Sequence, residues 1–226
     1  MRLDDIKKVA VLGAGTMGPG IAQTFAHHGY EVGFYTRRQE TMDRAMGVIQ
    51  TNLDLFVAKG LLTEVERLSL LDHLHPTLSL PEAVSGADLI VETIAEKRDL
   101  KRELFGQLDG LCGPEVIFTS NTSSLNIYEL SPRPATTVIA HWFAPPHSLP
   151  LIEVVRGPET SDDTVETVVA LMKHLGKTPV VLKKFVAGFL INRLLRAIGR
   201  EMFYLLDNDF VTPEDLDLAV KASRAP

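Results

Sequence analysis

A histidine and a glutamate twelve residues apart are the two side chains of this sequence best suited to moving a proton. His141 ends a predicted apolar strand, and Glu153 stands alone among the apolar residues of the next strand. A carboxylate in such a run is unfavourable unless it is paired, and beside an imidazole it favours the charged ring and fixes its tautomer. The pattern therefore predicts a general acid–base pair. The alternative, a solvent-facing edge glutamate and a hydrogen-bonded core histidine, stays open.

A run of small polar side chains follows another predicted buried strand. The sequence Ser-Asn-Thr-Ser-Ser occupies residues 120–124, directly after the apolar strand that ends at Thr119. Ligands of open α/β sheets bind outside the carboxyl ends of the strands. We therefore expect this run to line a ligand site, with His141 at the end of the following strand.

A glycine-rich turn near the N-terminus indicates a site for nucleotide phosphates. Residues 13–18 read Gly-Ala-Gly-Thr-Met-Gly and lie between a buried strand and a helix that we expect to open at Thr16. Gly13 permits the tight turn, Gly15 lets a pyrophosphate approach, and Gly18 allows helix and strand to pack closely. The first helical amides, at Thr16 and Met17, then face the phosphates. The less favoured alternative is a glycine turn with a purely structural role.

The end of the second predicted strand bears on which dinucleotide binds. An acid that accepts hydrogen bonds from the adenosine ribose is expected there. The position holds Thr36 instead, followed by Arg37 and Arg38. Thr36 can bond a ribose hydroxyl, while the arginines can meet a 2′-phosphate, stack on adenine or stay solvated. On the residues alone, NAD and NADP therefore both stay open.

The distribution of apolar residues predicts the elements that position these side chains. Short apolar or β-branched runs alternate with stretches of helical spacing, which predicts an α/β fold with a Rossmann-type, doubly wound, mostly parallel sheet. Strands are expected at Lys8–Leu12, Glu31–Tyr35, Thr77–Leu78, Leu89–Glu92, Val116–Thr119, Thr137–Ala140, Leu151–Val155 and Pro179–Leu182. Helices are expected at Thr16–His28, Gln39–Lys59, Thr63–Asp72, Lys97–Leu108 and Val186–Leu206.

The pattern also predicts how the chain divides. Residues 1–185 are expected to form a dinucleotide-binding Rossmann domain, and residues 186–226 the start of an incomplete C-terminal helical domain. The expected last helix carries an apolar stripe, which the residues after it are too few to bury; it consists of Phe189, Leu190, Leu194, Ile198, Met202 and Leu205. Exposed apolar patches of this extent mark association surfaces, so we expect a homodimer.

Composition places the chain among ordinary globular proteins. Its 226 residues are 45% hydrophobic and 23% charged, and the net charge of −6 offers no general attraction for nucleic acid or for an anionic membrane. No apolar run approaches the roughly 20 residues that span a bilayer, and the lone Cys112 cannot form an internal disulfide. We therefore expect a cytoplasmic protein that acts on a small-molecule substrate, with no metal site.

Six ordered sequence blocks make the chain resemble the 3-hydroxyacyl-CoA dehydrogenase family. They are GAGTMGPGIA at residues 13–22, ADLIVETIAE at 87–96, SNTSS at 120–124, HWFAPP at 141–146, LIEVV at 151–155 and GFLINRLL at 188–195. The resemblance runs from the first of these blocks to the last and covers nearly the whole chain. They are also more specific than the glycine turn, which many dehydrogenases share.

The resemblance implies an NAD-dependent oxidoreductase of fatty acid metabolism. Such an enzyme moves a hydride between NAD and the 3-hydroxy group of a 3-hydroxyacyl-CoA. By this resemblance His141 is the catalytic histidine and Glu153 is its partner. Ser123 and Asn192 match the serine and the asparagine that hydrogen-bond the substrate.

The same resemblance assigns further residues to the cofactor. Glu96 and Lys101 match positions near the dinucleotide, in addition to the glycine turn, Thr36 and Arg37. Glu92 matches a family position to which we assign no role.

The sequence departs from the family at three places. Ala144 stands where the family has an asparagine before proline, and Thr36 stands where it has the ribose-binding acid. Of the helical domain that follows in the family, only the first helices are expected here. Two alternatives therefore stay open: a dehydrogenase of a free hydroxy acid of gulonate or carnitine type, and a nucleotide-binding domain without catalysis.

Overall fold

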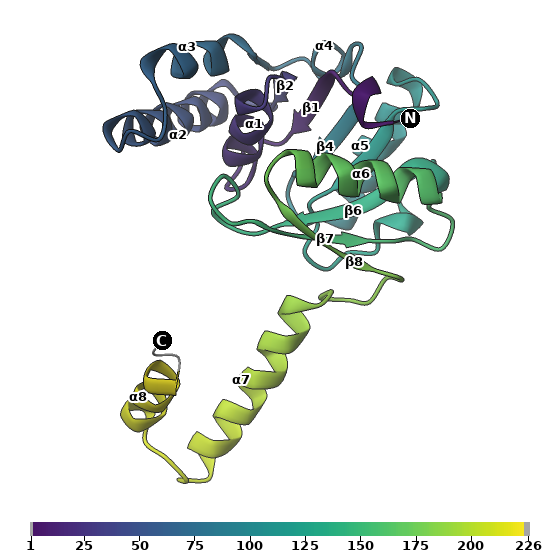
Figure 1. The fold of residues 1–226 in the computed structure, drawn as a ribbon. Helices are drawn as coiled ribbons and strands as arrows, with labels where there is room; N and C mark the ends of the chain where they lie inside the picture. Colours follow the sequence, from purple (N-terminus) through teal and green to yellow (C-terminus); the bar gives the residue numbers. More distant parts are fainter. Residues whose placement is uncertain (1, 224–226) are drawn as a thin grey trace. The chain divides into compact units, whose positions relative to one another are not determined.

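One eight-stranded sheet organises the first part of the chain. The computed structural model, which describes residues 2–223, divides into two compact units with the boundary between Ala187 and Gly188. The strands of the first unit are β1 (Lys8–Leu12), β2 (Glu31–Tyr35), β3 (Leu74–Thr77), β4 (Leu89–Glu92), β5 (Ile117–Ser120), β6 (Thr137–Trp142), β7 (Leu151–Val155) and β8 (Thr178–Leu182). Their order is β3-β2-β1-β4-β5-β6-β7-β8 (Figure 1). Neighbours are parallel except β6 and β7, so the predicted Rossmann-type α/β fold is confirmed.

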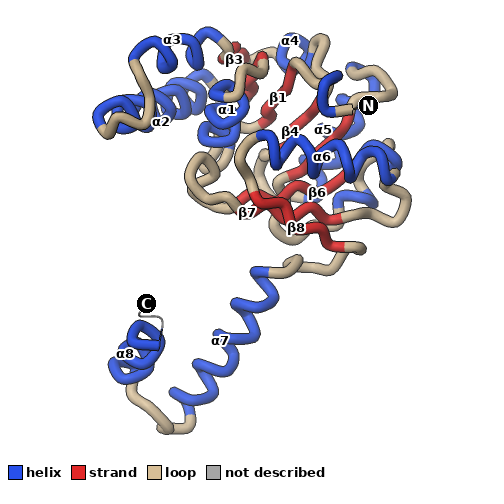
Figure 2. The backbone as a smooth tube through the Cα atoms, viewed as in Figure 1, coloured by secondary structure: helices blue, strands red, loops and turns tan. Residues whose placement is uncertain are grey.

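Helices connect the strands and cover both faces of the sheet, as Figure 2 shows. They are α1 (Gly18–His27), α2 (Gln39–Ala58), α3 (Glu64–Asp72), α4 (Leu80–Val84), α5 (Arg98–Leu111) and α6 (Asp162–His174). Three short 3-10 turns, η1 (Leu3–Asp5), η2 (Ile127–Glu129) and η3 (Pro134–Thr136), complete the unit. Crossover helices of this kind are what parallel strands require.

Alternate residues of β1 point to opposite faces of the sheet. Val9 and Val11 are fully buried in the core cluster that includes Phe25 of α1 and Val168 of α6. These two helices therefore cover one face. This packing buries the apolar residues that recur along the chain. Burying each side chain of this size stabilises the fold by roughly 1.5–3 kcal/mol.

The opposite face is covered by α4 and α5. Gly33 of β2 pairs with Ala10 of β1, and a Cβ at Gly33 would approach the carbonyl oxygen of Ala83 in α4 to 2.2 Å. Phe105 of α5 stacks on Phe118 of β5, with ring centroids 6.1 Å apart. Close backbone approach at Gly33 thus explains why that strand position carries no side chain.

Several elements differ from the sequence prediction. The strand predicted at Thr77–Leu78 lies at Leu74–Thr77 and contains Pro76, which β3 tolerates because an edge strand does not need every N–H donor. The helix predicted from Thr16 begins at Gly18, with Met17 as its N-cap. The apolar spacing did not lead us to α6, although Ser161 caps it by accepting a hydrogen bond from the backbone of Thr164.

The second unit contains α7 (Ile191–Asp207) and α8 (Pro213–Ser223). The predicted helix start at Val186 is wrong, because Gly188 and Phe189 have φ angles of +79° and +48° and so cannot continue a right-handed helix. Phe189 is buried and precedes α7, while Leu194 and Ile198 on the helix are about half exposed. Among the helices of residues 2–223, none combines the length and the apolar character needed to cross a bilayer.

Candidate active site

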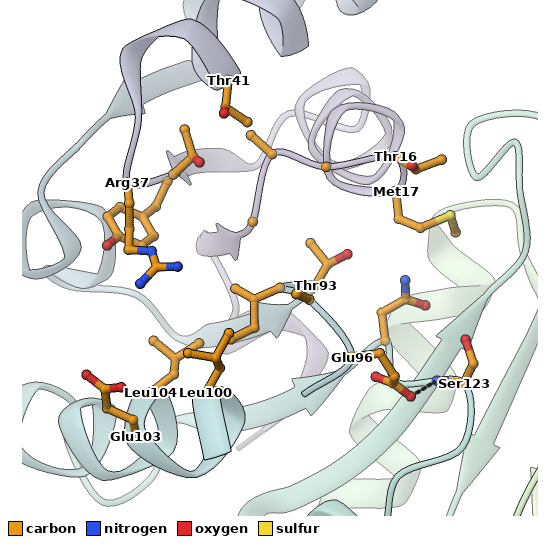
Figure 3. Close-up of a pocket in the computed structure, with 18 of the residues that line it drawn as sticks. Thr16, Met17, Arg37, Thr41, Thr93, Glu96, Leu100, Glu103, Leu104 and Ser123 are labelled. Carbon is orange, nitrogen blue, oxygen red and sulfur yellow. Dashed lines mark hydrogen bonds between the residues drawn. The ribbon is translucent and has the colours of Figure 1, made fainter. Parts of the chain in front are cut away.

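A cavity of about 600 Å³ opens at the carboxyl ends of β1, β2 and β4 (Figure 3). The strand order reverses direction between β1 and β4, and open α/β sheets bind ligands at such a switch point. The lining residues outside the glycine turn are Tyr35, Thr36, Arg37, Thr41, Thr93, Ile94, Ala95, Glu96, Leu100, Glu103, Leu104, Gln107, Asn121 and Ser123. The volume lies within the range of about 300–1,000 Å³ that small-molecule sites occupy.

The glycine turn after β1 fits a dinucleotide. Gly13 has a φ of +117°, and a Cβ there would lie 2.5 Å from the carbonyl oxygen of Thr93. A Cβ at Gly18 would lie 1.9 Å from the carbonyl oxygen of Gly13, so α1 approaches the turn through this glycine. Gly15 lines the cavity, and apart from its neighbours in the chain no residue has an atom within 4 Å of where its Cβ would be. That open space is what a pyrophosphate needs in order to reach the backbone.

Glu96 ties the β4–α5 loop to the polar run after β5. Its Oε1 accepts hydrogen bonds from Thr122 Oγ1 at 2.6 Å, from Ser123 N at 3.0 Å and from Ser124 N at 3.1 Å. Burial raises the pKa of Glu96, but the hydrogen bonds from this run and the charge of Lys101 outweigh it and hold the pKa below its usual range. Glu96 is therefore a carboxylate at neutral pH that fixes Ser123 at the cavity edge (Figure 3).

A buried ion pair lies behind this wall of the cavity. Lys101 Nζ donates to Glu92 Oε1 at 2.6 Å and lies 3.4 Å from Glu96 Oε2, while the side chains of Lys101 and Glu92 are 1% and 0% exposed. Glu92 Oε2 also accepts from Ser120 Oγ at 2.5 Å. Lys101 does not line the cavity, so its contact with the site passes through Glu96. The sequence analysis assigned no role to Glu92. The feature that could have identified it is its position as an acid at the end of an apolar strand.

His141 and Glu153 lie opposite each other on β6 and β7. The antiparallel register pairs the two residues directly, which places both side chains on the same face of the sheet. His141 Nδ1 is 2.8 Å from Glu153 Oε2, and the side chains are 7% and 0% exposed. The ring of Phe143 lies 4.6 Å from the imidazole, centroid to centroid. This is a buried, oriented imidazole–carboxylate contact.

Two further residues hold the segments around His141: Asn121, which belongs to the polar run at residues 120–124, and Lys177, which the sequence analysis did not single out. Asn121 Oδ1 accepts a hydrogen bond from the backbone N–H of Trp142 at 2.7 Å, which ties the segment after β5 to β6. Lys177 Nζ donates to the carbonyl oxygens of Pro146 at 2.6 Å and of Leu149 at 3.1 Å, and burial lowers the pKa of Lys177. The segment that follows His141 is therefore anchored at both ends.

The predicted site residues thus occupy three places. Those that line the cavity are Gly13, Gly15, Thr16, Met17, Thr36, Arg37, Glu96 and Ser123, with Gly18 and Lys101 directly behind its wall. His141 and Glu153 form their contact on neighbouring strands. Asn192 lies on α7 in the second unit, and its place beside the substrate stays a prediction. Within residues 2–223, no group of three or more His, Cys, Asp or Glu side chains is arranged to hold a metal ion.

Comparisons with known proteins agree on one family. Residues 8–185 match the sequence profile described as "3-hydroxyacyl-CoA dehydrogenase, NAD binding domain". A probable 3-hydroxybutyryl-CoA dehydrogenase of Deinococcus radiodurans is 38% identical over 217 residues, which cover 95% of this chain and 77% of that protein. The 5-formyl-3-hydroxy-2-methylpyridine 4-carboxylate 5-dehydrogenase of Mesorhizobium japonicum is 36% identical, with 95% of this chain and 70% of that protein covered. The crystal structure of (S)-3-hydroxybutyryl-CoA dehydrogenase from Ralstonia eutropha superposes with a TM-score of 0.89 at 35% identity, covering 93% of this chain and 75% of that one.

Proposed function

The chain belongs to the 3-hydroxyacyl-CoA dehydrogenase family, and we propose that it oxidises the 3-hydroxy group of a 3-hydroxyacyl-CoA, and reduces the 3-oxo form, through the pair His141 and Glu153. It is an NAD-dependent oxidoreductase with the Rossmann-type fold of that family. The observation that carries the proposal is the 2.8 Å contact between the buried imidazole and the buried carboxylate. An acid–base group of this kind is what alcohol oxidation requires.

The contact assigns a role to each nitrogen of the imidazole. Bound NAD supplies the hydride acceptor. With Glu153 ionised, its carboxylate only accepts, so His141 Nδ1–H donates and Nε2 exchanges the proton of the substrate hydroxyl. Glu153 fixes this tautomer and balances the charge that the ring gains with the proton. In the reverse direction Nε2 returns the proton to the substrate oxygen.

Two polar side chains are proposed to hold the reacting oxygen. Ser123 lines the cavity, and its backbone N–H is fixed by Glu96 at 3.0 Å. Its hydroxyl and the amide of Asn192 would donate to the substrate oxygen as negative charge develops there. Support for Ser123 comes from its position in the lining of the cavity. Support for Asn192 comes from the family motif at residues 188–195, which places it on α7.

A substrate panel tests the proposed reaction. We expect NAD to be reduced with 3-hydroxybutyryl-CoA at a higher kcat/KM than with free 3-hydroxybutyrate or other free hydroxy acids, because binding of the CoA portion contributes to orienting the acyl group. The measurement is the rise in NADH absorbance under steady-state conditions. Turnover of free hydroxy acids without turnover of the thioester would contradict the acyl-CoA assignment.

A dehydrogenase of a free hydroxy acid is the second candidate. One observation favours a free acid over a thioester: the Mesorhizobium japonicum relative is named as a dehydrogenase of a 5-formyl pyridine carboxylate, and its name includes no CoA group. Ala144, which replaces the asparagine of the family after His141, points in the same direction. The same substrate panel separates the two candidates, since each predicts a different best substrate.

We also propose that the enzyme works in the cytoplasm as a homodimer that pairs through α7. Leu194, Ile198 and Met202 follow each other on one side of this helix and are 51%, 53% and 36% exposed. Burying apolar side chains of this size against a second copy is favourable by roughly 1.5–3 kcal/mol each. Sedimentation of the whole chain should therefore show a dimer that the double variant Leu194→Lys/Ile198→Lys converts to monomer. Arg200→Gln is the matched control on α7, and a monomeric unmodified chain would refute the proposal.

A further inference from the structure

The cavity wall at the end of β2 is basic where a ribose-binding acid is usual. Thr36 and Arg37 follow Tyr35 directly, and both line the cavity together with Thr41 of α2. The first acid after β2 is Glu40, an exposed residue in the first turn of α2. Figure 3 shows the Arg37 side chain extending into the cavity toward Leu100 and Leu104 of α5. A guanidinium therefore stands at the adenosine end of the site.

The backbone fixes this end of the cavity relative to the glycine turn. Gly13 N donates to the carbonyl oxygen of Tyr35 at 2.9 Å, which joins the phosphate-binding turn to the last residue of β2. Thr36 N donates to the carbonyl oxygen of Thr77 at 3.4 Å, which joins the next residue to β3. The backbone that carries Thr36 and Arg37 is thus fixed relative to the turn, at the place where the adenosine ribose of a bound dinucleotide lies in this fold.

Arg37 differs from most arginines of the first unit in having no carboxylate partner. The arginines with an ion pair there are Arg2, Arg67, Arg98, Arg102, Arg133 and Arg156. Within residues 2–223, neither Arg37 nor Arg38 forms an ion pair with an acid. Glu103 of α5 also lines the cavity; it forms no ion pair with Arg37, and its Oε1 accepts a hydrogen bond from Gln107 Nε2 at 3.4 Å. The positive charge of Arg37 is therefore available to an anion in the cavity.

An acid at the end of β2 favours NAD because it accepts from the ribose hydroxyls and repels a 2′-phosphate. At this position Thr36 offers a hydroxyl that can donate or accept, and Arg37 offers the fork of donors that binds phosphate in a bidentate way. The positive end of the α2 helix dipole lies at the same end of the cavity, where Glu40 in the first turn partly offsets it. Thr36 and Arg37 thus favour an additional phosphate, against the repulsion from Glu103, whose carboxylate lines the cavity on α5.

We propose that this cavity binds NADP as well as NAD, and that Arg37 and Thr36 form the binding site for the 2′-phosphate of NADP. NAD binds through the same glycine turn, with Thr36 contacting the ribose hydroxyl in place of the phosphate. The enzyme therefore uses either NAD or NADP, in contrast to a relative that carries an acid at the end of β2.

Calorimetric titration with four nucleotides tests the proposal without relying on turnover. The probes are NAD and NADP, and the fragments 5′-AMP and 2′,5′-ADP, which differ only in the 2′-phosphate. For the unmodified chain we expect NADP to bind with a Kd comparable to that of NAD, and 2′,5′-ADP to bind more tightly than 5′-AMP. Failure of NADP and 2′,5′-ADP to bind while NAD binds would overturn the proposal and leave the NAD site intact.

Three variants identify the residues responsible. Arg37→Gln should shift the ratio of the NADP and NAD dissociation constants about 10- to 100-fold toward NAD, the loss expected for a hydrogen-bonded charge contact. Thr36→Asp should shift the same ratio in the same direction by repulsion. Arg38→Gln is the matched control, since it removes the same charge from a neighbour that does not line the cavity. It should leave the ratio unchanged.

The variants also separate the competing roles of Arg37. If Arg37 stacks on adenine, Arg37→Gln weakens both dinucleotides equally and the ratio stays constant. If the arginines act only through net charge, Arg38→Gln shifts the ratio as much as Arg37→Gln does. Either result would overturn the 2′-phosphate site, whereas a shift confined to Arg37→Gln and Thr36→Asp supports it.

Discussion

His141→Gln should lower kcat by about 10²–10⁴-fold, the usual contribution of a positioned general acid–base group. The amide cannot take the hydroxyl proton from the substrate, so the loss falls on the chemical step. The affinity for NAD should change little, because His141 is not among the residues that line the cavity. Steady-state kinetics give kcat, and calorimetric titration gives the Kd of NAD. His27→Gln, at an exposed position on α1, is the matched control and should retain activity.

Glu153→Gln completes this test because it separates positioning from proton transfer. The variant keeps the shape of the side chain but removes the charge that lies 2.8 Å from His141 Nδ1. A neutral amide favours the charged imidazole less than a carboxylate does, so the acid limb of the pH–rate profile should move to lower pH. A merely structural role for Glu153 would lower the rate without moving that limb. Undiminished activity in His141→Gln would remove the proposed mechanism altogether.

Lys101→Met should lower the free energy of unfolding of the first unit by about 3–5 kcal/mol, the usual cost of removing one partner from a buried ion pair. The substitution leaves the Glu92 carboxylate, which is 0% exposed, without the ammonium that lies 2.6 Å from it. Urea unfolding followed by tryptophan fluorescence measures this loss. The chain has one tryptophan, Trp142, which is 2% exposed and lies in the first unit, so the signal reports on that unit alone.

Two further variants show whether burial of the charge causes the loss. Lys101→Met combined with Glu92→Gln removes both charges and should recover part of the stability, because no unpaired ion is left in the core. Arg102→Met removes the ion pair with Asp99 on the same helix, where both side chains are largely exposed and screened by solvent, and should cost much less. Equal losses from Lys101→Met and Arg102→Met would contradict the role assigned to the buried pair.

The sequence by itself determined the features that depend on local chemistry. The glycine spacing at residues 13–18 follows from backbone sterics, because Gly13 needs its positive φ and Gly18 has no room for a Cβ. The apolar runs determined most strands of the sheet for a similar reason, since a strand buried on both faces must be apolar along its length. β3 was placed wrongly because an edge strand with Pro76 is only partly covered and shows no such run.

Tertiary structure decided which polar side chains meet. The sequence predicted that His141 and Glu153 form a pair but left a solvent-facing glutamate open as the alternative. The antiparallel register of β6 and β7 places the two residues opposite each other, and a slip by one residue would turn Glu153 to the other face. Likewise, nothing in the sequence around Glu92 shows that α5 will place Lys101 against it and exclude water from both charges. Pairing and burial depend on segments that come together only when the chain folds, and for this reason the sequence alone could not determine them.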